Sequence, residues 1–149
     1  MNSFFVLFFN LILIIFGVGC TTPRGIVVQN NILPVVEIRK AAAEIMGKPR
    51  IVSLNGRELT SFYHDQNFEF LDTNKKYISR YYTKVIILGA RRPYDVSVEV
   101  VFEKYDPIIK KFVELGLSRS LTRKKVEELK VALAKGLENF QKLDEVMPF

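Results

Sequence analysis

The sequence has little cysteine or histidine, the residues that supply sulfur and nitrogen ligands for metals: it has one cysteine, Cys20, and one histidine, His64, and it also has no tryptophan. A single cysteine excludes a disulfide within the chain, and one cysteine with one histidine is too few for a zinc site with nitrogen and sulfur ligands. No G-x-S-x-G, phosphate-binding-loop or H-E-x-x-H motif is present. Asp65, the neighbour that could orient His64 as a general base, points to the opposite face in a strand. We expect no enzymatic activity, metal or cofactor, and we expect His64 at the surface or in a loop.

Charge is absent from residues 1–20, which hold five of the twelve phenylalanines, whereas all 22 basic and 16 acidic residues follow. The apolar run from Phe4 to Phe16 covers about 20 Å as a helix, which is short of the roughly 30 Å hydrocarbon core of a bilayer. Counted through Cys20, the run reaches the lower length limit of a spanning helix. This length favours a cleaved signal peptide and leaves an uncleaved anchor open.

Small residues precede the cysteine in the segment Val18-Gly19-Cys20. This segment resembles the lipobox of bacterial lipoproteins, in which the thiol carries a diacylglyceryl group and cleavage leaves the cysteine as the first residue. The resemblance covers the start of the chain only. It implies a signal peptide over residues 1–19, lipid attachment at Cys20, and a location outside the cytoplasm on a membrane of the cell envelope, the outer membrane rather than the inner. Residues 20–31 are then expected to form a tether.

Two alternatives remain for this segment, namely simple secretion and an uncleaved helix. No Lys or Arg precedes the apolar run, whereas Arg24, Arg39 and Lys40 follow it. Because positive residues tend to stay on the cytoplasmic side, an uncleaved helix would hold the following domain in the cytoplasm. Such a domain would bind nucleic acid or anionic lipid.

The middle of the chain reads as a helix followed by hairpins. Pro34 fits the first turn of a helix that Gly47 ends, with apolar residues recurring at steps of three and four between them. Asn55-Gly56 separates two strand-like runs, 50–54 and 57–63, and predicts a type I′ turn. Residues 64–76 are expected as a loop with one short strand over residues 68–71.

Two long strands are expected next, over residues 77–88 and 94–105, and they are expected to pair with each other. In the second strand Val96, Val98 and Val100 alternate with a set that should face solvent. Residues 106–116 fit either a short helix or a turn followed by a strand over residues 111–117, and Asp-Pro favours the turn and strand.

A closing helix is predicted over residues 122–141, because apolar residues form one stripe along it. Gly136 lies near this stripe and suggests a close approach to the sheet. The basic trio Arg123-Lys124-Lys125 opposes the dipole at the start of this helix, so an anionic group is expected nearby.

Together these elements predict an α+β fold: a two-layer sandwich with two helices packed on a mostly antiparallel sheet of about four to six strands. Residues 32–149 would form this single domain. The outline is similar to that of the lipopolysaccharide-assembly lipoprotein, with a helix, a central meander and a closing helix, and this likeness transfers no residues.

One group of cations stands out because it interleaves with tyrosines around the long hairpin: Lys75, Lys76, Arg80, Lys84, Arg91 and Arg92. Arginine and lysine beside aromatic rings suit phosphate-bearing lipids, and the net charge of +6 favours anionic partners. The alternative is that strand alternation places Arg80, Tyr82 and Lys84 on a solvated face and Tyr81 in the core.

The function expected from these features is that of a lipid-anchored, non-enzymatic envelope protein. Its expected partners are the membrane, through the diacylglyceryl group on Cys20, and either an envelope protein or an anionic glycolipid at the candidate anion-binding residues. Nucleic acid is not expected as a partner.

Overall fold

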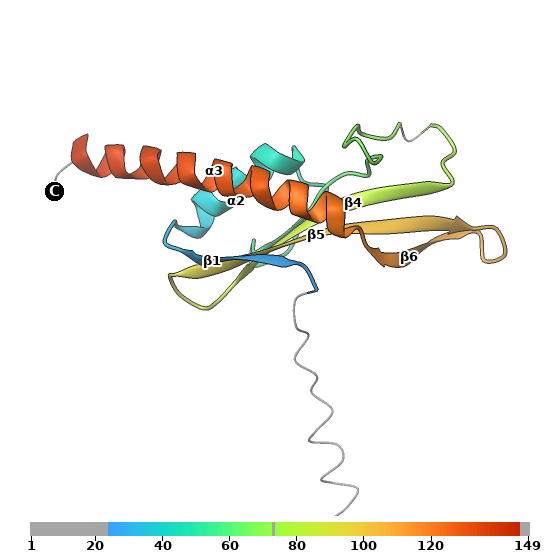
Figure 1. Cartoon of the computed structure of the whole chain (residues 1–149), viewed down its shortest axis with the longest axis horizontal. Coiled ribbons are helices and arrows are strands. Elements are labelled where there is room, and N and C mark those ends of the chain that lie inside the picture. The colour runs from blue at the N-terminus through green and yellow to red at the C-terminus, as the bar shows by residue number, and fades with distance from the viewer. Residues whose placement is uncertain (1–23, 73, 147–149) are drawn as a thin grey trace, which may run out of the picture.

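The computed structural model describes residues 24–72 and 74–146. The predicted signal peptide over residues 1–19, the lipid attachment at Cys20 and the first residues of the predicted tether lie outside the described residues. The described chain runs through these elements in order: β1 (Ile26–Asn31), α2 (Val35–Met46), β2 (Ile51–Val52), β3 (Glu58–Thr60), β4 (Ser79–Leu88), β5 (Tyr94–Asp106), β6 (Lys111–Leu117) and α3 (Arg119–Val146) (Figure 1).

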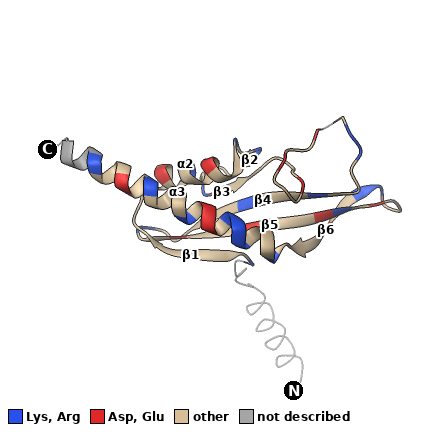
Figure 2. Ribbon diagram, turned by 45° about the horizontal axis from the view of Figure 1, so that its top comes forward, with Lys and Arg blue, Asp and Glu red and all other residues tan. Residues whose placement is uncertain are grey.

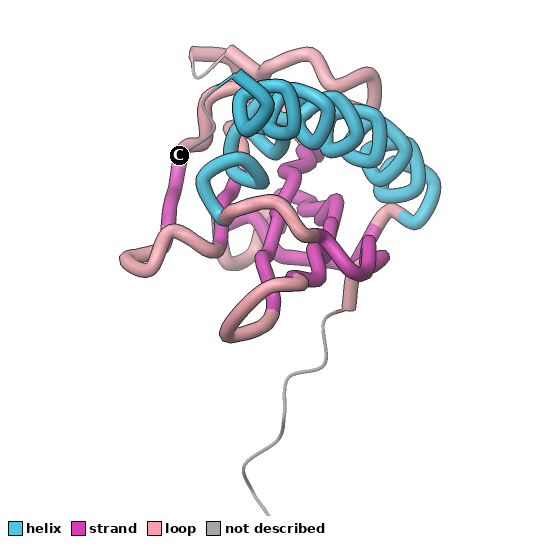
Figure 3. Tube along the Cα trace, turned by 90° about the vertical axis from the view of Figure 1, so that its left-hand side faces the viewer, coloured by secondary structure: helices cyan, strands magenta, loops and turns pink. Residues whose placement is uncertain are grey.

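The predicted fold class is confirmed. Six strands form one antiparallel sheet, and both helices pack on the same side of it, as the end view in Figure 3 shows. The strand order is β1-β5-β4-β3-β2, with β6 also paired to β5. Strand β5 carries two partners along one edge, because β1 pairs with its first half and β6 with its second half. The long hairpin of β4 and β5 is therefore the centre of the sheet.

The core lies between the sheet and the helices. Val96 and Val98 of β5 and Val85 of β4 are fully buried, and they pack in one apolar cluster with Ile38 of α2 and Leu129 of α3. Side chains alternate between the two faces of a strand, so the even-numbered residues of β5 and the odd-numbered residues of β4 face the helices.

The expectation that the other face of β5 would be wet is wrong for its central residues. Ser97, Glu99 and Val101 are buried as well. Strand β5 has neighbours on both sides, and the long side chains of Tyr82 and Lys84 stand directly opposite Val101 and Glu99 on that face. Cross-strand neighbours this close shield one another from water.

The tether predicted over residues 20–31 is wrong from Ile26 onward, because Ile26–Asn31 form strand β1, and the domain boundary expected at residue 32 moves accordingly. Strand β1 pairs antiparallel with β5, with Ile26 opposite Val98. Gly25 leads into this strand so closely that a Cβ there would lie 2.3 Å from the backbone oxygen of Val98. Only glycine allows the chain to join the sheet at this point.

The predicted hairpin at Asn55-Gly56 is present but shorter than expected, and the predicted turn type is wrong. Only Gly56 has a positive φ, of 67°, whereas a type I′ turn needs two such residues. The Gly56 amide donates to the Ser53 carbonyl oxygen at 2.8 Å, and the Asn55 side chain accepts bonds from the Ser53 hydroxyl and the Arg57 amide. These side-chain bonds hold Asn55 in the five-residue connection between β2 and β3.

The C-terminal third follows the favoured prediction. Residues 111–117 form strand β6 after a turn, and the closing helix α3 starts three residues earlier and ends five residues later than predicted. The expected close approach of Gly136 to the sheet is wrong, because a Cβ at Gly136 would lie 3.4 Å from Leu33, in the connection before α2. Residues 68–71 form no strand and make only a bridge between His64 and Phe70.

Candidate functional site

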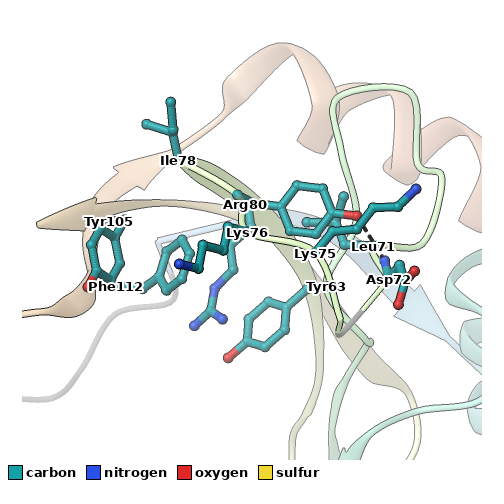
Figure 4. A pocket seen from close by; sticks show the side chains of 10 residues that line it. Tyr63, Leu71, Asp72, Lys75, Lys76, Ile78, Arg80, Tyr105 and Phe112 are labelled. Carbon is teal, nitrogen blue, oxygen red and sulfur yellow. Dashed lines mark hydrogen bonds between the residues drawn. The ribbon is translucent and has the colours of Figure 1, made fainter. Parts of the chain in front are cut away.

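A large cavity lies at one end of the sheet, on the face away from the helices. We call it the end pocket; its volume is about 690 Å³. Figure 4 shows the side chains that line it: Tyr63, Leu71, Asp72, Lys75, Lys76, Tyr77, Ile78, Arg80, Tyr105 and Phe112. Six of these ten are aromatic or aliphatic, and three are cations, so the pocket combines an apolar wall with positive charge.

Three parts of the chain build the end pocket: the loop before β4, the first residues of β4, and the ends of β5 and β6 beside their turn. The Tyr105 amide donates to the Ile78 carbonyl oxygen at 2.8 Å, which joins the last residue of the loop before β4 to the end of β5. In the loop, the Asp72 amide donates to the Tyr77 hydroxyl and the Leu71 amide to the Tyr63 carbonyl oxygen, both at 3.0 Å. These bonds hold the aromatic wall in place.

The structure brings together only half of the predicted anion-binding residues. Lys75, Lys76 and Arg80 line the end pocket. Lys84 lies further along β4 and forms an ion pair with Glu58 at 2.7 Å. Arg91 and Arg92 lie in the turn after β4, so the ten-residue strand separates them from the pocket by about 30 Å.

Arg80 belongs to the wall of the end pocket and is already paired. Its Nε donates to Glu103 Oε2 at 2.6 Å, and its guanidinium stacks 3.5 Å from the centre of the Tyr63 ring and 3.7 Å from that of Phe112. The register confirms the alternative that Arg80, Tyr82 and Lys84 share one face. Arg80 and Lys84 are nevertheless half-buried and paired with acids.

Lys75 and Lys76 are the free cations of the end pocket. Both are exposed, and neither forms an ion pair within residues 24–72 and 74–146. The one acidic residue of the lining, Asp72, accepts a bond from the Asn74 amide in the local turn. An anion entering the pocket would therefore meet the two lysines first.

Tyr82 packs against Tyr63 of the aromatic wall. The two rings meet edge to face, with their centres 6.2 Å apart. Burial raises the pKa of the Tyr82 phenol, and the negative charges of Glu114 and Glu103 raise it further. The phenol therefore stays neutral at physiological pH and adds no charge to this face.

His64 lies in the loop after β3, as one of the two predicted positions requires, but it is buried, with 3% of its surface exposed, so the alternative of a surface position is wrong. The loop after β3 folds back along β4, which places the imidazole against the Phe68 ring. Its Nδ1 bonds to the Asp65 carbonyl oxygen at 2.8 Å and its Nε2 to the Thr83 hydroxyl at 3.1 Å. Burial lowers the pKa of His64, so the ring is neutral. Its bond to Thr83 holds the loop against β4.

The anionic group expected near the start of α3 is provided in part by the chain itself. Lys125 is buried, and its Nζ donates to the Ile45 carbonyl oxygen at 2.7 Å and to Glu128 Oε2 at 2.6 Å. Ile45 lies in the last turn of α2, where the helix dipole is negative. Elsewhere along α3, basic and acidic residues follow one another along the helix (Figure 2).

A second cavity, of about 560 Å³, was not anticipated from the sequence. It lies where β1 starts, β6 ends and α3 starts, and its lining includes three arginines, Arg24, Arg119 and Arg123. Arg24 forms an exposed ion pair with Glu114 at 3.4 Å. Arg24 is about 95 positions away from the other two, so only the pairing of β1 and β6 with β5 brings them together.

Among the described residues, no three histidine, cysteine or acidic side chains gather in a way that could hold a metal ion. The described helices include none with the length and apolar character needed to cross a membrane. Comparison of the chain with protein-family models, with curated proteins and with solved structures finds no match.

Proposed function

We propose that the protein is a lipid-anchored, non-enzymatic binding module of the cell envelope, and that it binds an anionic amphiphile such as a phosphate-bearing glycolipid in the end pocket. The anchor is the diacylglyceryl group on Cys20, which places the domain outside the cytoplasm, on the outer membrane rather than the inner. The observation that carries the proposal is the end pocket itself, where an apolar wall and the free cations Lys75 and Lys76 meet.

The size and lining of the end pocket suit such a ligand. Small-molecule sites typically enclose about 300–1,000 Å³ with mostly apolar walls and a few placed polar groups, and the end pocket, at about 690 Å³, lies within that range. The aromatic wall would take the apolar part of the ligand. The two lysines would take its phosphate as point charges, because Arg80 is held by Glu103.

The anchor is tested by metabolic labelling with a fatty acid. Wild-type protein is expected to carry the label and Cys20→Ala to lose it, because the thiol is the only attachment point in the lipobox-like segment. An unlabelled wild-type protein that retains its first methionine would contradict the anchor and favour the uncleaved alternative.

The binding site is tested by titrating lipopolysaccharide into the wild type and two variants of equal charge. Lys75→Gln/Lys76→Gln removes both free cations of the end pocket, and Arg91→Gln/Arg92→Gln removes two exposed cations from the far end of β4. Two lysines at about 1 kcal/mol each predict a loss of roughly 30-fold in affinity for the first variant. The second should bind like the wild type; equal losses would show that only net charge matters and would refute the site.

A further inference from the structure

We propose that the turn between β5 and β6 inserts its tip into the surface of an anionic lipid bilayer. The inference deepens the proposed function, and rests on it in one respect: the end pocket beside the turn would then face the surface that presents its ligand. The segment concerned is Pro107–Lys110, which connects Asp106 of β5 to Lys111 of β6. We call it the β5–β6 tip.

The β5–β6 tip exposes two adjacent isoleucines. Ile108 and Ile109 are 88% and 54% exposed. The Asp106 carboxylate accepts the amides of both, at 2.8 and 3.3 Å, and Lys110 takes a positive φ of 53° to close the turn. Because Asp106 holds the backbone in this way, the tip has a defined shape, and its apolar side chains face water instead of the core.

A third exposed isoleucine lies at the same end of the molecule. Ile78 lines the end pocket and is 76% exposed, and its carbonyl oxygen is bonded to the Tyr105 amide at the end of β5. Apolar surface at a convex end is unfavourable in water and favourable at the boundary of a bilayer. Isolated exposed apolar residues are common, but three at one end beside an aromatic-lined pocket mark a contact surface.

Cations surround these isoleucines. Lys110 is the last residue of the tip, Lys111 follows it in β6, and Lys75 and Lys76 lie in the adjacent pocket. All four are exposed, and none is ion-paired in the part of the chain that the structure describes. Lysine stems can lie along apolar surface while the ammonium groups reach phosphates above it.

A bilayer fits this end better than a partner protein does. The centres of protein interfaces are depleted in lysine, and a stable interface buries about 800 Å² on each side. The β5–β6 tip is a narrow turn surrounded by lysines. An anionic bilayer supplies both an apolar layer for the isoleucines and a charged layer for the lysines.

The absence of tryptophan from the chain makes this inference directly measurable. In the full chain, Ile108→Trp introduces one indole at the tip, and Leu54→Trp introduces one at a fully exposed position in the β2–β3 connection. Each variant is mixed with vesicles of phosphatidylglycerol and phosphatidylcholine, and with vesicles of phosphatidylcholine alone, with brominated acyl chains as quenchers.

For Ile108→Trp on the anionic vesicles we expect emission at shorter wavelength and quenching by the brominated chains, and for Leu54→Trp we expect neither. Unshifted, unquenched emission from Ile108→Trp while the protein floats with the vesicles would overturn the inference. Equal quenching of Ile108→Trp in both vesicle types would overturn the charge requirement. Fatty-acid labelling at Cys20 and lipopolysaccharide titration are separate measurements, so failure of the proposed function is distinguishable from failure of tip insertion.

Discussion

Replacing Arg80 by methionine tests whether this side chain stabilises the wall of the end pocket or is merely solvated at its surface. Arg80→Met keeps an unbranched apolar stem but removes the guanidinium that stacks between Tyr63 and Phe112 and pairs with Glu103. Each cation–π contact contributes about 0.5–1 kcal/mol, and a mostly buried carboxylate left without its partner costs about 1–3 kcal/mol. We expect the free energy of unfolding to fall by about 3 kcal/mol.

Two companion variants separate these contributions. Arg80→Lys retains the charge but loses the planar stack, so we expect a loss of about 1 kcal/mol. Adding Glu103→Gln to Arg80→Met removes the stranded carboxylate, so the double variant should be about 1.5 kcal/mol more stable than Arg80→Met alone.

The measurement is urea unfolding followed by circular dichroism, with all variants compared at one pH and salt concentration. A loss below about 0.5 kcal/mol for Arg80→Met, or a double variant no more stable than the single one, would show that Arg80 is solvated and does not hold the wall. In that case Arg80 would join Lys75 and Lys76 as a cation available to the ligand.

Two further predictions concern buried groups outside the end pocket. Lys125→Met leaves the Ile45 carbonyl oxygen at the end of α2 without its charged donor, so the free energy of unfolding measured in urea should fall by about 2 kcal/mol. Glu128→Gln alters only the more exposed partner of Lys125 and should cost about 0.5 kcal/mol. Equal losses would contradict the conclusion that the bond from Lys125 to Ile45 is the stronger of its two contacts. Because burial holds the pKa of His64 below its usual value near 6.5, its neutral form stabilises the fold fully above that pH, and the contribution is lost as the pH falls towards the lower pKa of the folded state. His64→Asn should therefore lose less stability than the wild type between pH 7 and pH 5, and parallel pH profiles would refute the buried position.

Elements with strong local patterns were predictable from the sequence. Helix α2 is bounded by Pro34 and Gly47, and the alternating valines of β5 predict a strand that pairs with β4. The Asp-Pro turn before β6 is also a local signal. In each case the residues that determine the element lie within a few positions of one another, so the local sequence pattern is enough to predict it.

Features that depend on distant residues were missed. Strand β1 consists of six residues whose partner, β5, lies about 70 positions later. Its three β-branched residues, 26–28, favour a strand, but so short a run does not specify the strand with which it pairs. The burial of His64 was missed for the same reason, because it requires the loop after β3 to fold against Thr83 of β4.

The sequence alone determined the fold class, the face of the sheet on which each residue of β4 and β5 lies, and the group of six candidate cations. Only the tertiary structure decided which of these cations share a cavity. Alternation specifies the side of a strand but not the position along it, and β4 is long enough to place Arg91 and Arg92 at one end and Lys75 and Lys76 at the other. The walls of the end pocket come from segments up to about 50 positions apart, which only the register of β5 with β4 and β6 brings together.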